Sequence, residues 1–236
     1  WEFSVEGYYK DMRNVLEYKD GVSFFGSSSG WENKVEMGKG RSAGIEFMAQ
    51  KTAGKTTGWL SYTLSKSDRK FTKGGINNGE WFPYKYDRRH SINLTINHKF
   101  SDRIDIGASW VFYTGGTSTI PEEKTTVIRP HNGANNGFLW YGTYDNTNSS
   151  PTIGDVSYIE HRNNFRLPAS HRLNLGVNFN KKTKHGMRTW NISLYNAYNA
   201  MNPAWVYRGH NKQGLSVIKK YTLLPLIPSF TYTYKF

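Results

Sequence analysis

Residues 91–113 read SINLTINHKFSDRIDIGASWVFY, and the pattern of this stretch decides the fold. In residues 91–98 the apolar side chains of Ile92, Leu94 and Ile96 alternate with polar ones. In residues 104–113 a similar alternation sets Ile104, Ile106, Ala108, Trp110 and Phe112 against Asp105, Gly107, Ser109 and Tyr113. A period of two places apolar side chains on one face of a β-strand and polar ones on the other. The stretch therefore predicts two antiparallel strands joined by a short turn at residues 101–102.

The same alternation recurs along the rest of the chain, so an all-β fold with about eight strands is expected. Each alternating segment has about ten residues, which is the length that a tilted strand needs to cross a bilayer. No run of about 18 apolar residues occurs, which excludes a helical membrane protein. The six further alternating segments are residues 1–10, 43–50, 59–66, 172–180, 189–196 and 229–236.

The connections between these segments alternate in length, which places short turns at one end of the sheet and long loops at the other. This asymmetry is typical of an antiparallel transmembrane β-barrel of the outer membrane. A soluble barrel alternates as well, but a polar face of Asn, Ser, Thr and Gly suits a water-filled lumen. The short turns are residues 52–55, 101–102 and 181–186, and the long loops are residues 13–40, 67–88, 115–170 and 198–225.

Aromatic side chains near the strand ends also favour the membrane, because such residues form girdles at both interfaces of a barrel. The predicted girdle residues are Trp59, Trp110, Phe112, Tyr113, Phe179, Trp190, Tyr232 and Tyr234.

Charge is distributed unevenly along the chain, which carries a net charge of +13 and no cysteine. Residues 1–160 hold 19 basic and 18 acidic residues, whereas residues 161–236 hold 12 basic residues and no acidic one. A uniformly basic nucleic-acid-binding protein would not divide in this way, so no nucleic-acid partner is expected. The last third of the chain is expected to meet lipid headgroups, lipopolysaccharide phosphates or an acidic ligand.

Strand-like motifs recur, in order along the chain, at residues 38–46, 58–67, 87–94, 167–175, 195–203 and 225–236. These six stretches resemble strands of TonB-dependent outer-membrane receptors. The resemblance implies a barrel of about 22 strands filled by an N-terminal plug. Residues 1–236 would then be the C-terminal portion of one barrel domain, its last eight strands, with the plug and earlier strands outside this chain. The opening at Trp1, inside a strand pattern, also predicts a piece of a longer protein.

The function that the resemblance implies is TonB-dependent active import of a scarce, large ligand across the outer membrane of a Gram-negative cell. The ligand could be a siderophore, cobalamin, haem or an oligosaccharide, and the TonB complex would act through the missing N-terminal part. The ending with Pro225 and Pro228 is most similar to the branch that has a carboxypeptidase-regulatory-like N-terminal domain. One alternative is a plugless or scaffold barrel in a larger complex with a surface lipoprotein. Another is a free-standing eight-stranded barrel.

Aromatic and basic side chains in the long loops are the candidate ligand vestibule. Large flat side chains suit stacking on sugars or planar siderophore groups, and arginine suits carboxylates. The alternative is that these side chains pack the long loops internally. The candidates are Trp81, Phe82, Tyr84, Arg88, Arg89, Trp140, Tyr141, Tyr144, Trp205 and Tyr207.

Polar side chains of the strands are expected to face the lumen, and the terminal strand resembles an insertion strand. No catalytic order of Ser, His and Asp and no metal-ligand spacing occurs, so no enzyme, metal or cofactor is expected. His90 and His171 are expected to have structural roles near the rim. The lumen-facing candidates are Glu46, Asn93, Asn97, Asp105, Asn174 and Asn178, and those of the insertion strand are Tyr232, Tyr234 and Phe236.

Basic side chains near the loops are expected to contact lipopolysaccharide phosphates, or an acidic ligand. Those at residues 181–188, by contrast, are expected to contact phospholipid headgroups of the inner leaflet. The loop-end candidates are Arg88, Arg89, Arg162, Arg166, Arg208, Lys212, Lys219 and Lys220.

Overall fold

The computed structural model of the protein describes residues 1–19, 30–72, 75–121, 123–129 and 152–236. Among the described residues, no helix is long and apolar enough to cross a membrane. The chain divides into two compact units, which are described separately: residues 1–119 with 161–236, and residues 120–160.

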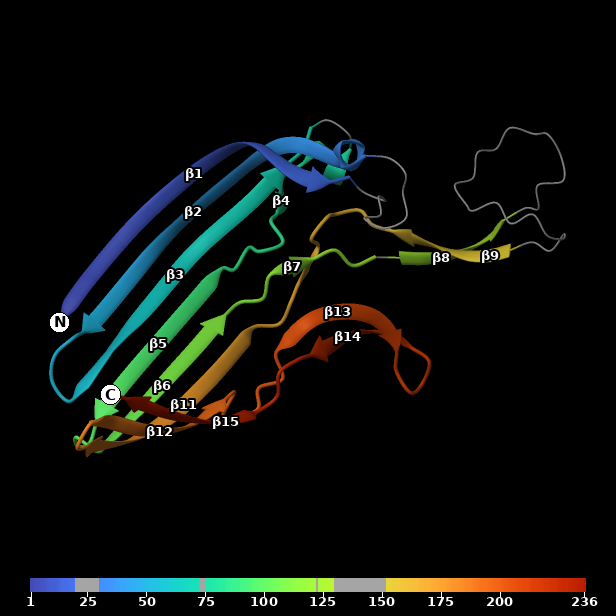
Figure 1. Ribbon diagram of the computed structural model, residues 1–236. Coiled ribbons are helices and arrows are strands. Elements are labelled where there is room, and N and C mark those ends of the chain that lie inside the picture. The colour runs from blue at the N-terminus through green and yellow to red at the C-terminus, as the bar shows by residue number, and fades with distance from the viewer. Residues whose placement is uncertain (20–29, 73–74, 122, 130–151) are drawn as a thin grey trace. The chain divides into compact units, whose positions relative to one another are not determined.

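The first unit contains one antiparallel sheet in which eight strands follow each other in the order β1-β2-β3-β5-β6-β11-β12-β15 (Figure 1). The two-residue strand β4 (Phe82–Pro83) pairs with β3 outside this path. Strands β1 and β15 are the two ends, so the sheet is open within the described residues. The strands are β1 (Glu2–Tyr18), β2 (Val35–Lys51), β3 (Thr56–Lys70), β5 (His90–Lys99), β6 (Ile104–Tyr113), β11 (Ser170–Thr183), β12 (Gly186–Tyr195) and β15 (Ile227–Lys235).

Shorter elements lie in the long connections. In the first unit β7 (Thr117–Ser118) pairs with β10 (Phe165–Arg166), and β13 (Pro203–His210) pairs with β14 (Ser216–Thr222). The 3₁₀ turns η1 and η2 are Trp31–Lys34 and Ile76–Gly79. The second unit contains the hairpin of β8 (Glu123–Arg129) and β9 (Thr152–Tyr158).

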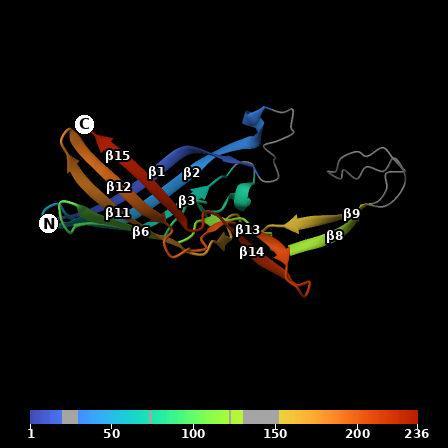
Figure 2. The ribbon, with the colours of Figure 1, turned by 60° about the horizontal axis from the view of Figure 1, so that its bottom comes forward.

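Short turns gather at one end of the sheet, here called the turn end, and long connections at the opposite loop end. Both chain termini lie at the turn end, beside the hairpins β2–β3 and β11–β12 (Figure 1). Strands β11, β12 and β15 run side by side in both views (Figure 2). The predicted alternation of short and long connections is therefore confirmed, and so are all eight predicted strands.

The first three strands are much longer than predicted, with 17, 17 and 15 residues. Residues 13–18 and 35–40 were expected in a loop but continue the β1–β2 ladder. The ladder passes a bulge at Asn14, whose φ is +57°. A bulge shifts the alternation by one residue, so a period-two pattern cannot follow the strand through it.

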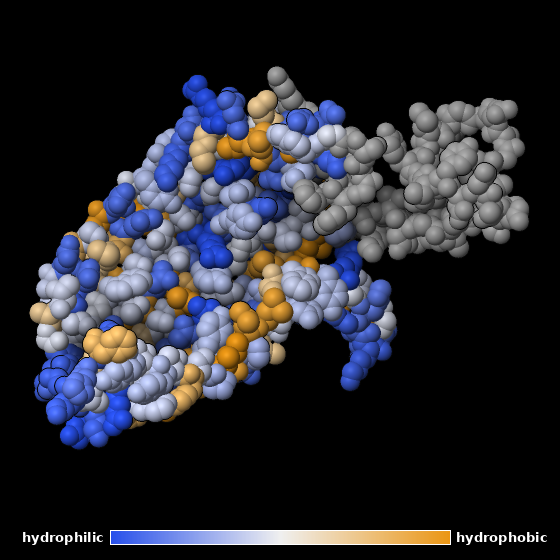
Figure 3. Space-filling model, in the orientation of Figure 1, coloured by the Kyte–Doolittle hydropathy of each residue, from blue (hydrophilic) through white to orange (hydrophobic). Residues whose placement is uncertain are grey.

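The register gives the sheet one apolar and one polar face. A cross-strand row joins Leu60, Leu94, Trp110 and Leu173, and this side is called the apolar face. Many of its side chains are exposed, with 72% of Phe3 and 44% of Leu60 accessible, and Leu94, Trp110 and Leu173 are partly exposed. Figure 3 shows apolar side chains lying at the surface among hydrophilic ones. An uncovered apolar face is what the lipid-facing wall of a membrane barrel requires.

The opposite side, called the polar face, carries the row Thr95, Ser109 and Asn174. Trp59 pairs with Thr95, and Tyr113 pairs with Ser91 and Ser170, so both aromatics lie on this face. Their assignment to a lipid-side girdle was wrong, because each lies one residue away from the apolar positions of its strand.

A small apolar cluster closes the loop end of β1–β3. Phe71, Ile76 and Phe82 are buried and pack together, with Val15 against them. A Cβ atom at Gly38 would lie 2.4 Å from the Phe71 ring, so glycine leaves the space that this ring occupies. The cluster anchors the connection that follows β3, from which several candidate site residues extend.

Candidate ligand-binding vestibule

All six side chains predicted to face the lumen share the polar face. At the turn end, Asp105 accepts hydrogen bonds from the side-chain amides of Asn178 and Asn180, each at 2.6 Å. Asn191 donates in turn to Asn178 at 2.7 Å. Nearer the loop end, Asn174 donates to Ser109 at 3.1 Å. These amides form a cross-strand network that keeps the polar face hydrophilic and ordered.

A buried carboxylate fixes the connection between β3 and β5 at the loop end. The Asp87 side chain is fully buried and accepts a hydrogen bond from the Ser67 backbone N–H at 2.7 Å. Its other oxygen lies 2.6 Å from Arg166 Nη2 and 3.5 Å from Arg89 Nη2. Arg166 also donates to the Gly115 carbonyl at 2.9 Å. This cluster joins three connections and orients the loop that carries Arg88.

Arg88 itself stacks on the polar-face aromatic Tyr113, with its guanidinium carbon 3.9 Å from the ring centroid. Both line a pocket of about 420 Å³ together with Lys85, Tyr86 and Trp205. The rest of the lining comes from residues 115–118, from Leu167, Pro168 and Ser170, and from the start of β13. The pocket thus combines two cations with three aromatic rings, a set that suits an anionic ligand with flat groups.

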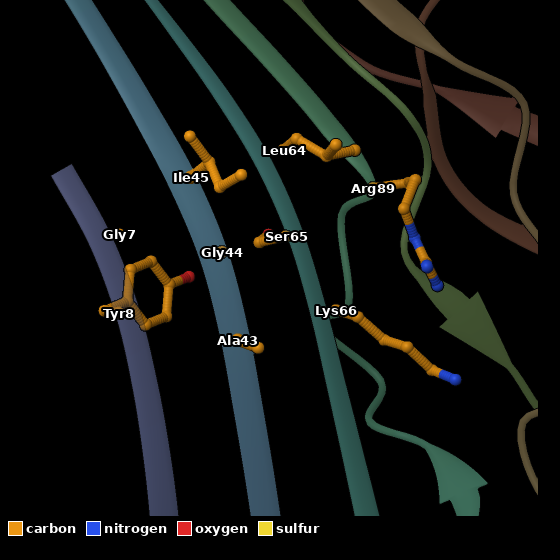
Figure 4. Close-up of a pocket in the computed structure, with 9 residues that line it drawn as sticks. All are labelled: Gly7, Tyr8, Ala43, Gly44, Ile45, Leu64, Ser65, Lys66 and Arg89. Atoms are coloured by element: carbon orange, nitrogen blue, oxygen red, sulfur yellow. The ribbon is translucent and has the colours of Figure 1, made fainter. Parts of the chain in front are cut away.

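A second, shallow trough lies on the same face toward β1 and has a volume of about 470 Å³. Figure 4 shows Tyr8 and Arg89 on either side of Gly44 and Ser65. A Cβ atom at Gly44 would lie 2.7 Å from the Tyr8 ring, so glycine is needed for Tyr8 to lie across β2. Arg89 lines this trough and is partly exposed to solvent there, while its guanidinium also contacts Asp87.

Two predicted vestibule aromatics do not lie where a ligand in the vestibule could meet them. Phe82 is only 2% exposed and belongs to the apolar cluster, so its prediction was wrong. Trp81 stacks on Arg41 at 4.3 Å, and the register places Arg41 on the apolar face. Trp81 therefore lies on the apolar face of the sheet, whereas the vestibule lies on the polar face. Neighbouring residues of an extended segment point to opposite sides, which loop composition does not reveal.

The remaining predicted aromatics divide between packing and exposure. Tyr84 lies under the guanidinium of Arg69 at 4.0 Å. Trp205 stacks on Tyr221, with ring centroids 4.3 Å apart, and Tyr207 lies on the same side of that hairpin. Both Trp205 and Tyr207 are about half exposed. Trp140, Tyr141 and Tyr144 lie outside the residues that the structure describes.

Several loop-end cations predicted to contact lipopolysaccharide are bound within the protein instead. Arg166 binds Asp87, and Arg162 contacts Glu17 at 3.3 Å. Lys220 donates to the Met201 carbonyl at 2.9 Å. Arg162 and Arg166 thus connect separate segments, and Lys220 makes a contact within its own connection between β12 and β15.

Both rim histidines share hydrogen bonds with tyrosine hydroxyls. His90 Nδ1 lies 2.9 Å from the Tyr62 hydroxyl, and His171 Nδ1 lies 2.8 Å from that of Tyr198. Trp110 also donates to Tyr198 at 3.1 Å. These contacts support the structural roles expected for the two histidines. In the described part of the chain, no three His, Asp or Glu side chains converge as a metal site would need.

Sequence reasoning missed Lys85, Tyr86 and Tyr113 as lining of the Arg88 pocket, and Tyr8 as the wall of the trough. Tyr113 had a usable signal, since it occupies a polar position in the alternation of β6 at its loop end. For Lys85 and Tyr86 no such pattern exists, because their positions depend on the buried Asp87.

Comparison with known families agrees with this geometry. A family model described as "TonB dependent receptor-like, beta-barrel" matches residues 1–200. A search of curated proteins finds no match. The matched family is one of transporters rather than enzymes, located in the outer membrane of Gram-negative bacteria and acting with TonB. With an open antiparallel sheet that has one exposed apolar and one polar face, and a match over most of its length, this chain belongs to the TonB-dependent receptor β-barrel family.

Proposed function

We propose that this protein imports a scarce, large ligand across the outer membrane by TonB-dependent active transport. The observation that carries the proposal is the pocket at the loop end of the polar face, where Arg88, Tyr113 and Trp205 meet. Two cations beside aromatic rings favour ligands that carry carboxylate, phenolate or phosphate groups on flat scaffolds. Among siderophore, cobalamin, haem and oligosaccharide, such a pocket favours an anionic siderophore or haem.

In this proposal the chain is the C-terminal portion of one barrel domain and the polar face lines its lumen. The plug and the TonB-contacting segment belong to the part of the protein that precedes it. Ligand captured at the loop end would then be released toward the turn end when TonB rearranges the plug. The amide network around Asp105 and Asn178 would keep that wall hydrated.

The apolar face would contact outer-membrane lipid and lipopolysaccharide, and β15 would be the terminal insertion strand. Tyr232 lies 4.4 Å from Trp190 by ring centroids, which supports a small aromatic girdle near the turn end. Tyr234 and Phe236 continue this aromatic ending. Relation to the branch with a carboxypeptidase-regulatory-like domain stays a prediction.

A scaffold barrel that is capped by a surface lipoprotein is a second candidate function. The hairpin β13–β14 favours it, because Trp205, Tyr207 and Tyr221 leave nearly half of their surfaces exposed on one side. Exposed aromatic side chains are typical anchors of protein interfaces. A transporter and a scaffold differ in whether Trp205 meets a small ligand or a second protein.

Replacing Trp205 by alanine or Arg88 by glutamine should each weaken ligand binding about tenfold, since each variant removes one stacking or charge-assisted contact. Binding is measured on the protein purified from outer membranes, with a ferric siderophore, haemin, cyanocobalamin and a maltooligosaccharide as probes. Lys212→Gln is the matched control, because Lys212 is exposed in the turn of the same hairpin and does not line the pocket.

Unchanged binding in both pocket variants, with at least one probe bound by the wild type, would contradict the proposed site. Should no probe bind while a lipoprotein co-purifies and is lost from the Trp205→Ala variant, the scaffold function would replace import.

A further inference from the structure

Three cations form a continuous row across the first three strands near the loop end. Arg13 on β1 is the register partner of Lys39 on β2, and Lys39 is the partner of Lys70 on β3. Adjacent strands lie about 4.8 Å apart, so the row spans about 10 Å. The same register places these side chains on the apolar face, with Ile45, Phe47 and Leu64 further toward the turn end.

The row is not neutralised by neighbouring acids within the described residues. None of the ion pairs there includes Arg13, Lys39 or Lys70. In the next row toward the turn end, Asp68 is already paired, 3.0 Å from Arg41 and 3.6 Å from Lys66. The acid opposite Arg41 in that row is the exposed Asp11. Because Asp68 is already paired and Asp11 is the other acid in that row, Arg13, Lys39 and Lys70 form a strip with a net positive charge.

The strip borders a cavity large enough for a charged headgroup. A pocket of about 740 Å³ is lined by Arg13, Lys39 and Lys70, together with Lys19 and Trp81. Glu36 also contributes to the lining, and both of its carboxylate oxygens are buried without a hydrogen-bond partner. Cations therefore outnumber the single acid four to one in this lining.

The position of the strip on the sheet indicates which anion it meets. On its turn-end side the apolar face is exposed, with Ile45 46% and Phe47 45% accessible. Trp81, stacked on Arg41, lies at the same level, as interfacial tryptophans do in membrane proteins. A cationic row on the loop-end side of an exposed apolar band, with the row of Asp11, Arg41 and Asp68 between them, corresponds to the level at which lipid headgroups begin.

We propose that Arg13, Lys39 and Lys70 bind the phosphate groups of a phosphorylated lipid in the outer leaflet. The arginine fork would donate two N–H groups to phosphate oxygens, and the two lysines would act as compact positive charges. Acyl chains of the same lipid would lie along the apolar band below. The site is on the opposite face from the Arg88 pocket, so it does not depend on which ligand the protein imports.

The test replaces all three cations by glutamine (Arg13→Gln, Lys39→Gln, Lys70→Gln) in the complete protein purified from outer membranes. Phosphorylated lipid retained per protein is measured by mass spectrometry, and binding is measured with bisphosphorylated lipid A, with phosphate-free lipid A and with inorganic phosphate. A triple variant at the turn end, Lys181→Gln, Lys184→Gln and Arg188→Gln, removes the same charge and is the matched control.

We expect the loop-end variant to lose at least about tenfold in affinity for bisphosphorylated lipid A, while the control changes less than about twofold. An equal loss in both variants would overturn the proposal in favour of non-specific charge. Equal wild-type binding of phosphate-free lipid, or tight binding of inorganic phosphate alone, would overturn it as well. If the triple variant does not fold, the single variants Arg13→Gln and Lys39→Gln, both at exposed positions, decide the outcome by the same measurement.

Discussion

Replacing Asp87 by asparagine is expected to destabilise the folded protein by about 3 kcal/mol, because one partner of a buried charge cluster is removed. The asparagine oxygen could still accept from the Ser67 N–H. Its amide group, however, would face the donors of Arg166 and Arg89, which lie 2.6 and 3.5 Å from the carboxylate oxygen in the native protein. Urea-induced unfolding in detergent micelles, followed by tryptophan fluorescence, measures the change.

Asp102→Asn is the control for this prediction, since it removes a carboxylate from the exposed β5–β6 turn. A hydrogen bond from Lys99 at 2.9 Å lowers the pKa of Asp102, and the charges of Lys99 and Lys182 lower it further. Both variants exchange an aspartate for an asparagine, but the Asp102 side chain is 83% exposed. No measurable change is expected for Asp102→Asn. Similar unfolding midpoints for the two variants would contradict the structural role of Asp87.

The Asp87 variant should also disturb ligand binding, because the loop with Lys85 and Arg88 depends on this cluster. The ligand pocket is lined by Lys85 and Arg88 of this loop and by Tyr113 of β6. Displacement of the loop would therefore separate Arg88 from Tyr113. Weaker binding without loss of stability would show that Asp87 acts on the pocket alone.

Replacing Gly58 by alanine is expected to destabilise the folded protein by about 2–3 kcal/mol. A Cβ atom there would lie 2.2 Å from the Thr95 carbonyl oxygen and 3.0 Å from the Ile96 Cα. Both atoms belong to the backbone of β5, so no side-chain rotation can relieve the overlap and the strands must separate. The same unfolding experiment measures this cost.

Gly176→Ala tests whether the overlap, rather than the loss of any strand glycine, is responsible. At Gly176 in β11, an added Cβ would find its nearest neighbour, the Ser193 Cβ, at 3.6 Å, an ordinary contact. This variant should change stability by less than about 0.5 kcal/mol, or raise it slightly by restricting the unfolded chain. A larger loss at Gly176 than at Gly58 would refute the explanation by backbone overlap.

The alternation of residues 91–113 was sufficient to predict a hairpin, and β5 and β6 are found within a residue of the expected bounds. The shared face of Asp105, Asn174 and Asn178 could be predicted as well. Both follow from strand geometry, since side chains alternate strictly along a strand and register is fixed wherever one face is apolar.

The extension of β1–β3 could not be predicted in this way. Beyond Ile45 the strands carry charged and glycine residues on both sides, so hydropathy no longer alternates, while backbone pairing continues to Tyr18 and Val35. Backbone hydrogen bonds form whatever the side chains are, once the first rows fix the register. Only this pairing brings Arg13, Lys39 and Lys70 into one row.

By itself, then, the sequence determined the eight strands, their alternating turns and loops, and which strand residues share a face. These properties are local, because period-two alternation and turn length depend only on residues close in the chain. Only the tertiary structure decided the roles of the loop residues. Adjacent Trp81 and Phe82 lie on opposite sides, Arg166 binds Asp87 from 79 residues away, and Arg88 meets Trp205 in one pocket. Such contacts join distant segments, and composition does not specify which partners meet.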